Sequence, residues 1–429
     1  MAKVKLRLGI AGLGTVGAAA VRILQEHSTM LSARSGAEFD INAVSARSRQ
    51  KDRGVDLSGY DWEDDPVALA RRDDIDVFIE LMGGEDGPAK ASIEAALETG
   101  KHVVTANKAL LAHHGQAMAE AAEAANKQLR FEAAVAGGIP VIKALTEGLA
   151  ANKVTRILGV MNGSCNYILT RMEDANLTYQ QAFDEADGLG YLEADPELDV
   201  GGIDAAHKLA LLSAIGFGAQ VNYPGVATTG IGKVTIEDIR AARTLGFAIK
   251  LLGVTEPSGD GLAQLMEPCL IPEGAPLAQL KGGTNMVVIE GDAVGQLVLR
   301  GPGAGASETA SAVLGDVMDI ARGIDIPVFG QAAATLQKLP AKTPAREAAY
   351  YIRCPVKDEP GVLAKIAGAL AASDISIDRM RQPQHEDGTA TILIVTHPKS
   401  RDAMAGALAE MDNLDIMLQP PFALPIIDI

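Results

Sequence analysis

The chain of 429 residues contains little cysteine and few aromatic side chains. Its three cysteines, Cys165, Cys269 and Cys354, are scattered, and their spacing indicates neither a disulfide framework nor a metal site. No segment approaches the roughly 18 consecutive apolar residues of a membrane span. The N-terminus also lacks the apolar run and cleavage site of a secretory signal. From these absences we expect a cytoplasmic protein without a membrane anchor.

Positive charge is also scarce, because 38 lysines and arginines face 55 aspartates and glutamates, and the formal net charge is −17. Such a chain is a poor binder of nucleic acid or of anionic membranes. Aromatic residues make up 4% of the chain, whereas apolar residues make up 48%. The core must therefore be built from Ala, Val, Leu and Ile, which is typical of α/β proteins with buried strands. The length predicts two or three domains.

Strands and helices alternate over residues 1–137. A buried strand over 5–11 leads into GLGTVG (12–17) and an apolar-periodic helix through Leu24. Further strands are predicted at 39–46, 77–82, 102–105 and 129–134, with helices between them at 88–99 and 115–126. This alternation predicts an α/β domain with a doubly wound parallel sheet.

The pattern changes after Pro140. We expect a helix to Ala150, a strand over 156–161, a loop NGSCNY (162–167) and a helix over 236–245 capped by Thr235. Apolar runs at 248–254 and 286–290 indicate a second sheet. Residues 138–300 are therefore predicted to form an α+β domain.

Three C-terminal segments complete the expected organisation. RGPGAGASET (300–309) is a second glycine loop that opens a helix to about Arg322, so residues from about 300 to 325 would complete the first domain. Residues 326–347, in a Pro- and Ala-rich stretch, predict a linker. Residues 348–429 show strand, helix, strand, an EDG turn (386–388), strand, helix and strand, which predicts a ferredoxin-like βαββαβ domain.

GLGTVG lies between a strand and a helix, as a dinucleotide-binding fingerprint requires. Gly12 would make the tight turn, Gly14 would let the backbone approach a pyrophosphate, and Gly17 would let the helix pack closely on the strand. Free N–H groups at the start of the helix would bind the phosphates. We therefore predict a Rossmann-type domain that binds a dinucleotide. The alternative is a glycine loop with a structural role alone.

The choice of cofactor depends on the end of the second strand. NAD binders usually place an acidic residue there, but this chain has VSARSRQKDR (44–53), in which Arg47, Arg49 and Lys51 precede the first carboxylate, Asp52. Cations at this point suit the 2′-phosphate of NADP. We predict NADP, with NAD possible, and the alternative is a solvated basic loop.

The segment GLGYLEADPELDVGGIDAAHKLALL (188–212) has the most unusual composition in the chain. A lysine, Lys208, follows a cluster of five carboxylates at Glu193, Asp195, Glu197, Asp199 and Asp204. Asp204 and Lys208 are four residues apart, so they share one face of a helix. A lone lysine beside carboxylates suits the binding of an ammonium-bearing substrate and the movement of a proton at a neighbouring oxygen. The alternative is an ordinary helix with a surface ion pair.

A second lysine follows another strand, in HVVTANKALL (102–111). Lys108 comes just after the carboxyl end of the strand, where open α/β sheets bind their ligands. The alternative is a surface lysine at the start of a helix.

Together GLGTVG, VVTANKALL, NGSCNYIL, GYLEADPELDVGGIDAAHKL and GAGASETA closely resemble homoserine dehydrogenase, in the expected order from residue 5 to about 325. DEPGVL (358–363) is similar to the opening of an ACT domain, a small-molecule sensor often fused to enzymes of amino-acid biosynthesis. The resemblance implies that 138–300 is a catalytic and dimerisation domain and that 348–429 is an ACT regulatory domain.

The resemblance implies the reversible, NAD(P)-dependent interconversion of L-homoserine and L-aspartate 4-semialdehyde, a step in threonine, isoleucine and methionine biosynthesis. It makes Lys208 the proton donor to the aldehyde oxygen and Lys108 a group that orients this oxygen. The implied substrate-binding residues are Glu193, Asp199, Asp204, Gly163 and Ser164. The implied cofactor-binding residues are Gly12, Gly14, Thr15, Val16, Gly17, Arg47, Thr105, Lys108 and Gly305.

FEAAVAGGI (131–139) resembles the monovalent-cation site of the family. The resemblance implies that Na+ or K+ binds oxygens of Glu132, Val135, Gly137 and Ile139, mostly backbone carbonyls. The chain departs from the family pattern at 307–309, where it has SET instead of a proline before the threonine. This departure leaves the contacts of the second glycine loop open.

The ACT-like segment predicts an amino-acid effector, most simply the pathway product L-threonine, bound at Asp358, Gly361, Val362 and Leu363. Because Gly361 has no side chain, backbone N–H groups at the helix start can approach a carboxylate. Asp358 would either accept the ammonium of the ligand or only cap the helix. The alternative is a dimerisation module without a ligand. ACT-like units commonly pair their sheets, so we expect a homodimer or homotetramer.

Two rival functions remain open at this point. A catalytically silent amino-acid sensor that binds a dinucleotide would not need Lys208. A dehydrogenase or reductase for a different amino-acid semialdehyde would need it. A cofactor-dependent assay with homoserine separates all three possibilities.

Overall fold

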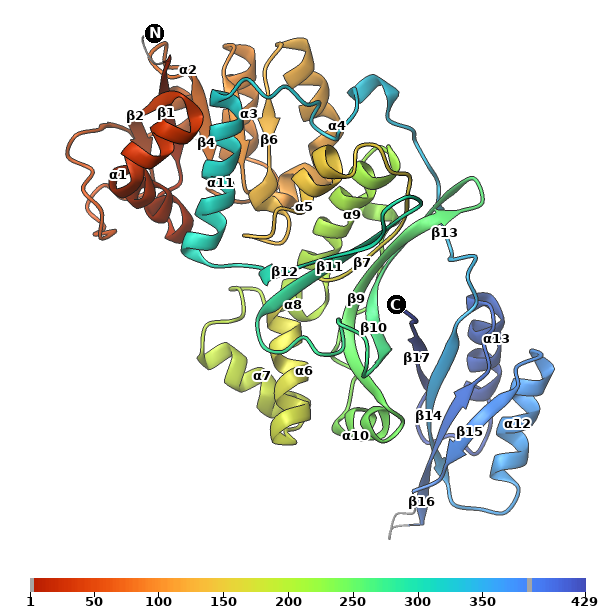
Figure 1. The fold of residues 1–429 in the computed structure, drawn as a ribbon. Coiled ribbons are helices and arrows are strands. Elements are labelled where there is room, and N and C mark those ends of the chain that lie inside the picture. Colours follow the sequence, from red (N-terminus) through yellow and green to blue (C-terminus); the bar gives the residue numbers. More distant parts are fainter. Residues whose placement is uncertain (1–3, 384–387) are drawn as a thin grey trace. The chain divides into compact units, whose positions relative to one another are not determined.

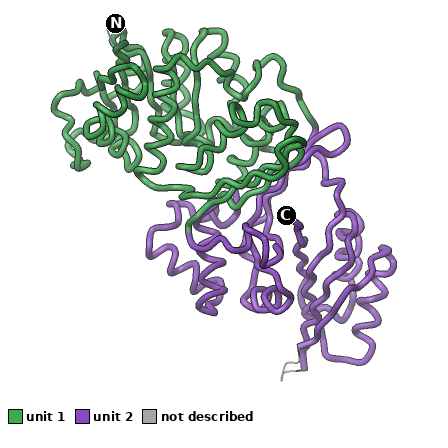
Figure 2. The backbone as a smooth tube through the Cα atoms, in the orientation of Figure 1, with its two compact units in different colours: residues 1–161, 204–226, 283–339 green, residues 162–203, 227–282, 340–429 purple. Residues whose placement is uncertain are grey.

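The computed structural model describes residues 4–383 and 388–429, which form two compact units (Figure 2). The first unit contains Met1–Met161, Asp204–Val226 and Gly283–Leu339, and the second contains Asn162–Ile203, Ala227–Gly282 and Pro340–Ile429. Glu386 and Asp387 of the predicted EDG turn lie outside the described residues. The domain boundaries expected from the sequence, at 137, 300 and 347, stay predictions.

The first unit contains a six-stranded parallel sheet (Figure 1). Its strands are β1 (Val4–Ala11), β2 (Ala37–Ser45), β3 (Asp61–Glu63), β4 (Val77–Glu80), β5 (His102–Thr105) and β6 (Leu129–Arg130). They lie in the order β3-β2-β1-β4-β5-β6, so the direction of winding reverses between β1 and β4. The prediction of a doubly wound parallel sheet is confirmed, and ligands bind such sheets at the point of reversal.

Helices accompany this sheet. They are α1 (Thr15–Ser35), α2 (Pro66–Arg71), α3 (Pro88–Glu98), α4 (Lys108–Ala124) and, from much later in the chain, α11 (Ala306–Ala321). Valines and leucines of α11 share one hydrophobic core with Leu8 and Ile10 of β1. Ala19 and Ala20 of α1 pack with Ala310 of α11 in a smaller buried cluster. These short side chains let the two helices approach closely, so α11 belongs to the core of the parallel-sheet domain.

The first unit also contains α9, the helix that carries Lys208, and several shorter elements. These are the 3₁₀ turn Glu132–Ala134, α5 (Val141–Lys143), the π-helical turn Ala144–Gly148, β7 (Val154–Val160), α9 (Ile203–Phe217), β11 (Thr284–Gly291) and β12 (Gly295–Pro302). Strand β11 pairs antiparallel with both β7 and β12.

The second unit begins with α6 (Gly163–Ala175), α7 (Tyr179–Gly188) and α8 (Glu197–Val200), and continues with β8 (Ala227–Thr228), α10 (Ile236–Thr244) and the antiparallel hairpin of β9 (Phe247–Ser258) and β10 (Gly261–Pro272). After β13 (Ala341–Lys342) its C-terminal part contains β14 (Ala349–Lys357), α12 (Val362–Ala372), β15 (Ile377–Arg381), β16 (Thr389–Thr396), α13 (Arg401–Asp412) and β17 (Phe422–Ile426). The strand order β17-β14-β16-β15 with antiparallel pairing confirms the predicted βαββαβ fold.

A buried carboxylate joins α10 to this C-terminal sheet. Asp238 is fully buried, and its Oδ1 accepts hydrogen bonds from the Tyr351 hydroxyl (2.9 Å) and from Nε of Arg353 (2.8 Å). Its Oδ2 accepts the backbone N–H of Thr235 (2.9 Å), which is the N-cap of α10 as predicted. The carboxylate therefore closes a capping box and holds β14 at the same time.

Several predicted boundaries are wrong because a side chain binds the backbone. Asn107 accepts the N–H of Leu110, so α4 begins at Lys108 and not near Gly115. Asn162 accepts the N–H of Cys165, so the predicted loop 162–167 is mostly the first turns of α6. Asparagine is common both in loops and at helix N-caps, and the sequence pattern does not separate the two.

Two further predictions fail around residue 132. The predicted strand 129–134 ends at Arg130, because the carboxylate of Glu132 accepts the N–H groups of Ile142 and Lys143 and the backbone turns there. The predicted helix to Ala150 is only one short α-helical segment followed by the π-helical turn.

Among the helices of the described residues, none combines the length and the apolar character that a membrane crossing requires.

Candidate active site

The two predicted lysines meet at one carboxylate. Asp204 and Lys208 lie one turn apart on α9, and their side chains are only 9% and 10% exposed. Lys208 Nζ lies 2.7 Å from Oδ2 of Asp204 and donates to the carbonyl of Met161 at 2.8 Å. Lys108, the first residue of α4, places its Nζ 2.8 Å from Oδ1 of Asp204. The alternative of a surface ion pair is therefore wrong, because this cluster is buried.

Burial and the charges of the two lysines have opposite effects on the pKa of Asp204. Burial by itself raises the pKa of Asp204, but the charges of Lys208 and Lys108 outweigh burial and hold this pKa below the ordinary aspartate value. Asp204 is therefore ionised at neutral pH. A buried carboxylate with two ammonium partners satisfies both oxygens, whereas loss of one partner leaves buried charge uncompensated.

Aromatic side chains pack beside the lysine cluster. The rings of His207 and Tyr223 are 4.3 Å apart, and His113 of α4 lies 5.1 Å from Tyr223 and 5.7 Å from His207. Burial lowers the pKa of His207 to about 4, so its ring is neutral at pH 7. These contacts fix α4 against α9, and they thereby fix the helices that carry Lys108 and Lys208. None of the three rings was predicted from the sequence, although His207 directly precedes Lys208.

The predicted substrate residues of the second unit form a separate group. Asp199 is buried, and its carboxylate accepts the backbone N–H of Glu193 (2.9 Å) and the side-chain amide of Asn162 (2.9 Å). Ser164, in the first turn of α6 after Gly163, donates its hydroxyl to the carbonyl of Tyr191 (2.6 Å). The carboxylate of Glu193 is exposed. The predicted residue Asp199 and the unpredicted Asn162 thus hold the acidic loop on the start of α6 and leave Glu193 accessible.

The first glycine loop has the geometry of a phosphate-binding turn. Gly12 has φ +96°, and a Cβ there would lie 2.4 Å from the carbonyl oxygen of Leu81. A Cβ on Gly17 would lie 2.0 Å from the carbonyl oxygen of Gly12, whereas a Cβ on Gly14 would meet nothing within 4 Å. Helix α1 begins at Thr15, which Val16 follows, and its first turn has neither a side-chain cap nor an acidic residue. Its N–H groups are therefore suited to an anion.

Three arginines lie in the basic loop that follows β2, and one of them contacts the glycine loop. Arg53, which the sequence analysis did not single out, donates to the carbonyls of Leu13 (3.0 Å) and Ser48 (2.5 Å) and so joins the glycine loop to the basic loop. The guanidiniums of Arg49 and Arg53 lie 5.9 and 5.6 Å from the ring centre of Trp62. Arg47 is exposed just after the end of β2.

A buried glutamate organises the neighbouring strand ends. Glu80, at the end of β4, accepts the N–H groups of Met82 (2.7 Å) and Gly83 (3.1 Å) and the hydroxyl of Thr105 (2.6 Å). The hydroxyl of Thr105 in turn accepts the N–H of Asn107, the cap of α4. This chain of hydrogen bonds leads from the point where the sheet reverses to Lys108. Glu80 was not predicted, because its bond with Thr105 spans 25 residues of sequence.

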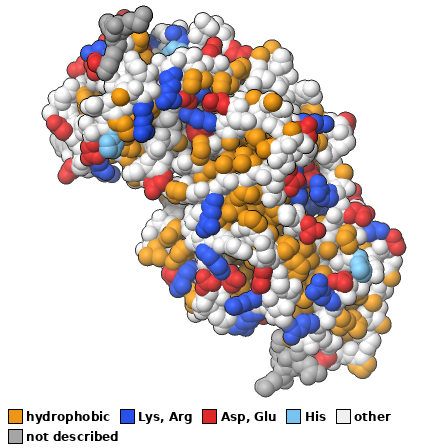
Figure 3. Space-filling model, viewed as in Figure 1, with side chains coloured by type: hydrophobic (Ala, Val, Ile, Leu, Met, Phe, Trp, Pro, Cys, Tyr) orange, Lys and Arg blue, Asp and Glu red, His pale blue; other side chains and the backbone are white. Residues whose placement is uncertain are grey.

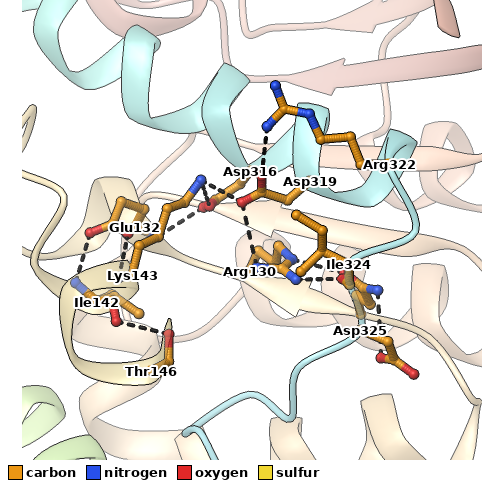
Figure 4. A network of polar contacts seen from close by, with 11 residues as sticks. Arg130, Glu132, Ile142, Lys143, Thr146, Asp316, Asp319, Arg322, Ile324 and Asp325 are labelled. Atoms are coloured by element: carbon orange, nitrogen blue, oxygen red, sulfur yellow. Dashed lines mark hydrogen bonds and ion pairs between the residues drawn. The ribbon is translucent and has the colours of Figure 1, made fainter. Parts of the chain in front are cut away.

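The predicted cation segment lies beside a buried polar network (Figure 4). Glu132 donates its backbone N–H to Asp316 of α11 (2.8 Å), and Lys143 lies 3.5 Å from Asp316 and 2.5 Å from Asp319. Burial, helped by the charge of Asp316, raises the pKa of Glu132 to about 7, and burial raises the pKa of Asp316 to about 6. Both oxygens of Glu132 bind amide groups, at Ile142 and Lys143.

Backbone oxygens remain for a cation in this segment. Val135 and Gly137 are buried, and among the hydrogen bonds of the described residues none ends on either of their carbonyls. Buried carbonyls normally have partners. The carbonyl of Ile139 accepts the N–H of Val141 (2.8 Å). Gly137 also approaches the second glycine loop, because a Cβ there would lie 2.6 Å from backbone atoms of Gly303, two residues before Gly305, the N-cap of α11.

The predicted effector residues lie at the end of β14 and the start of α12. Gly361 is the N-cap of α12 and has φ +94°, and no side chain caps this helix. The idea that Asp358 caps the helix is therefore wrong. Asp358 is exposed and accepts a long hydrogen bond from Gln382 (3.4 Å). Val362 is buried, and Leu363 is 38% exposed.

Comparison with protein families agrees with these observations. The model described as "Homoserine dehydrogenase" matches residues 140–318, the model of the homoserine dehydrogenase NAD-binding domain matches residues 12–132, and the ACT domain model matches residues 350–415. The homoserine dehydrogenase of Neisseria gonorrhoeae is 41% identical over 424 residues, which cover 97% of each chain. That of Bacillus subtilis is 36% identical over 426 residues, which cover 96% of each chain.

Solved structures agree as well. The homoserine dehydrogenase of Thiobacillus denitrificans has a TM-score of 0.92 at 38% identity and covers 99% of this chain and 98% of its own. A hyperthermophilic archaeal homoserine dehydrogenase mutant in complex with NADPH has a TM-score of 0.65 at 27% identity, and covers 75% of this chain and 99% of its own.

The space around Gly17 and Gly14 predicts that alanine at the first position lowers stability, whereas alanine at the second weakens cofactor binding. Gly17→Ala places a methyl group against the carbonyl of Gly12 and should lower the free energy of unfolding by about 1–3 kcal/mol. Gly14→Ala has room in the protein, so we expect unchanged stability and weaker binding of NADPH. Urea unfolding and a fluorescence titration with NADPH measure the two effects. A Gly14→Ala variant with wild-type affinity would show that the backbone at Gly14 does not approach the cofactor.

Proposed function

This chain belongs to the homoserine dehydrogenase family, and we propose that in its reaction, the interconversion of L-aspartate 4-semialdehyde and L-homoserine, Lys208 exchanges the proton at the substrate oxygen. The observation that carries the proposal is the buried ammonium of Lys208, held 2.7 Å from Asp204 while Asp204 also binds Lys108 at 2.8 Å. A catalytically silent sensor would not require a buried lysine at this position.

The chemistry of reduction explains why two cations are needed. When bound, the nicotinamide cofactor supplies a hydride to the aldehyde carbon. The aldehyde oxygen then gains negative charge, and a nearby ammonium stabilises this charge and delivers the proton that completes the alcohol. Lys208 takes the donor role and Lys108 orients the oxygen. In the direction of homoserine oxidation, Lys208 accepts the hydroxyl proton.

Asp204 acts first as a positioning residue in this proposal. Its two oxygens hold the two lysines, and a carboxylate has further lone pairs with which to meet the substrate's ammonium group. The exposed carboxylate of Glu193 is the other candidate for this ammonium. Asp199 and Ser164 support the loop that carries Glu193, and Gly163 begins the helix on which this loop lies.

Replacement of Lys208 tests the proton transfer. Both Lys208→Met and Lys208→Arg should lower kcat by at least about 10²-fold, the usual scale for one general acid–base group. Arginine keeps the positive charge beside Asp204 but releases its proton far less readily, so it separates proton transfer from charge balance. Steady-state oxidation of homoserine measures kcat, and an NADPH titration should show unchanged affinity.

The exposed Lys233 offers a matched control. Lys233→Met should leave kcat and the melting temperature unchanged. If Lys208→Arg turned over homoserine at nearly the wild-type rate, Lys208 would not be the proton donor.

We propose that NADP is the preferred cofactor, with Arg47 binding its 2′-phosphate. Support comes from the exposed position of Arg47 after β2 and from the lack of a carboxylate at this strand end. Arg47→Asp should shift the ratio of kcat/KM values toward NAD by at least about tenfold, because the phosphate loses a cation and meets a carboxylate. Arg71→Asp, in α2, changes charge equally and should not shift the ratio. A wild-type enzyme that prefers NAD would contradict the proposal.

We further propose that Na+ or K+ binds the carbonyls of Val135 and Gly137, with backbone oxygens of Glu132 and Ile139 completing the site. The unpartnered carbonyls at 135 and 137 support this assignment. Replacing NaCl and KCl by tetramethylammonium chloride at equal ionic strength should lower kcat/KM and the melting temperature, since this cation is too large for such a site. Identical values in all three salts would argue against it.

For the ACT domain we propose L-threonine as the effector, with its carboxylate at the uncapped start of α12 and its ammonium on Asp358. Full-length enzyme should bind threonine in a calorimetric titration and lose activity as it binds. Asp358→Asn should weaken threonine binding by about tenfold. Asp402→Asn, at the start of α13, is the matched control and should bind normally. Absence of threonine binding by the wild type would leave only a dimerisation role, and the homodimer or homotetramer stays a prediction.

A further inference from the structure

A cavity of about 530 Å³ lies inside the second unit, between α10 and the strands β14, β15 and β16 of the C-terminal sheet. This volume falls within the range of about 300–1,000 Å³ that is typical of small-molecule sites. None of the residues assigned above to substrate, cofactor, cation or effector lines it.

The cavity lies against the face of the C-terminal sheet that is turned away from α12 and α13. Ile352, Cys354, Ile392 and Ile394 point the other way, into the core shared with α12 and α13. Since side chains alternate along a strand, their neighbours in sequence face the cavity. The sheet therefore buries one face in its own core and presents the other to α10.

Register places two arginines in one row on the cavity face. Arg353 of β14 pairs with Leu393 of β16, and Leu393 pairs with Arg381 of β15. Adjacent strands lie about 4.8 Å apart, so the two arginine backbones are separated by about 10 Å with the leucine between them. Arg240 of α10 lines the opposite wall. Three arginines thus line the cavity together with Leu393 and Pro355.

The charge of this lining is unusual for a chain with a net charge of −17. Glu237 is the carboxylate that lines the cavity with the three arginines. Asp238, just outside, holds Arg353. Arg240 uses its Nε for Asn176 (2.9 Å), so its two terminal nitrogens stay available. Among the described residues, Arg381 has no ion-pair partner. Figure 3 shows basic side chains over α10 and the strands beside it.

We propose that this cavity binds a small organic anion with at least two oxyanion groups, either a phosphorylated or a polycarboxylate metabolite. Arg240 and Arg381 bind the oxyanions from opposite walls. Arginine suits this role because its planar guanidinium can donate two parallel hydrogen bonds to a carboxylate or phosphate group. Leu393 and Pro355 contact the carbon skeleton. Arg353 is held by Asp238 and adds positive potential. The site differs from the predicted effector residues, which belong to the start of α12.

Calorimetric titration of the full-length enzyme tests the proposal. Pyrophosphate and citrate serve as the two probes, and saturating NADPH keeps them from the glycine loop. We expect at least one probe to bind the wild type once per chain. Arg240→Ala and Arg381→Ala should each weaken this binding by about tenfold, the effect of one charge-assisted contact. Binding of one probe alone assigns the ligand class.

Arg243→Ala is the matched control, because Arg243 is exposed on α10 and does not line the cavity. It should bind within twofold of the wild type, and all variants should retain melting temperature and homoserine oxidation. Arg353 is left unchanged, since its removal would strand Asp238. The proposal is overturned if neither probe binds the wild type, if the Arg240→Ala/Arg381→Ala double variant binds like the wild type, or if Arg243→Ala is equally weakened.

Discussion

The proposed active site depends on the buried carboxylate of Asp204. This one group contacts Lys208 from its own helix and Lys108 from the start of α4, and both ammonium groups are needed to balance its burial. Coulomb attraction at this short range and low polarity exceeds the cost of burying the carboxylate, as its lowered pKa indicates. The two lysines are thus fixed relative to one another before any substrate arrives, and a preorganised charge costs no reorganisation during the reaction.

Other parts of the first unit serve to place this cluster. The capping amide of Asn107 starts α4 at Lys108, and Glu80 with Thr105 anchors the cap to the ends of β4 and β5. The rings of His113, His207 and Tyr223 hold α4 and α9 together, and the carbonyl of Met161 accepts a second hydrogen bond from Lys208. The glycine loop between β1 and α1 lies at the same sheet beside the point of reversal, where open α/β sheets bind their ligands.

Much of the architecture follows from the sequence by simple rules. Alternating strands and helices predict the parallel sheet, the Thr235 cap predicts the start of α10, and spacing predicts that Asp204 and Lys208 share a helix face. Two kinds of feature escape such rules. Asn107 and Asn162 look like loop residues until their hydrogen bonds are known. The turn that ends β6 depends on the bonds from the N–H groups of Ile142 and Lys143 to the carboxylate of Glu132, and the N–H of Glu132 meets Asp316 across 184 residues of sequence. The roles of Glu80 and Arg53 also depend on partners that only the fold brings near.

The ionisation of Asp204 is the most direct test of this account. Carboxyl ¹³C resonances of labelled aspartates, with Asp204 assigned by means of Asp204→Asn, can be followed from about pH 8 to pH 5, above the ordinary aspartate pKa of about 3.9. The account predicts that Asp204 keeps the chemical shift of an ionised carboxylate throughout this range, because Lys108 and Lys208 outweigh its burial. Burial without effective pairing would raise the pKa into the range. A titration of Asp204 between these limits would therefore contradict the claim that one ionised carboxylate holds the two lysines in place.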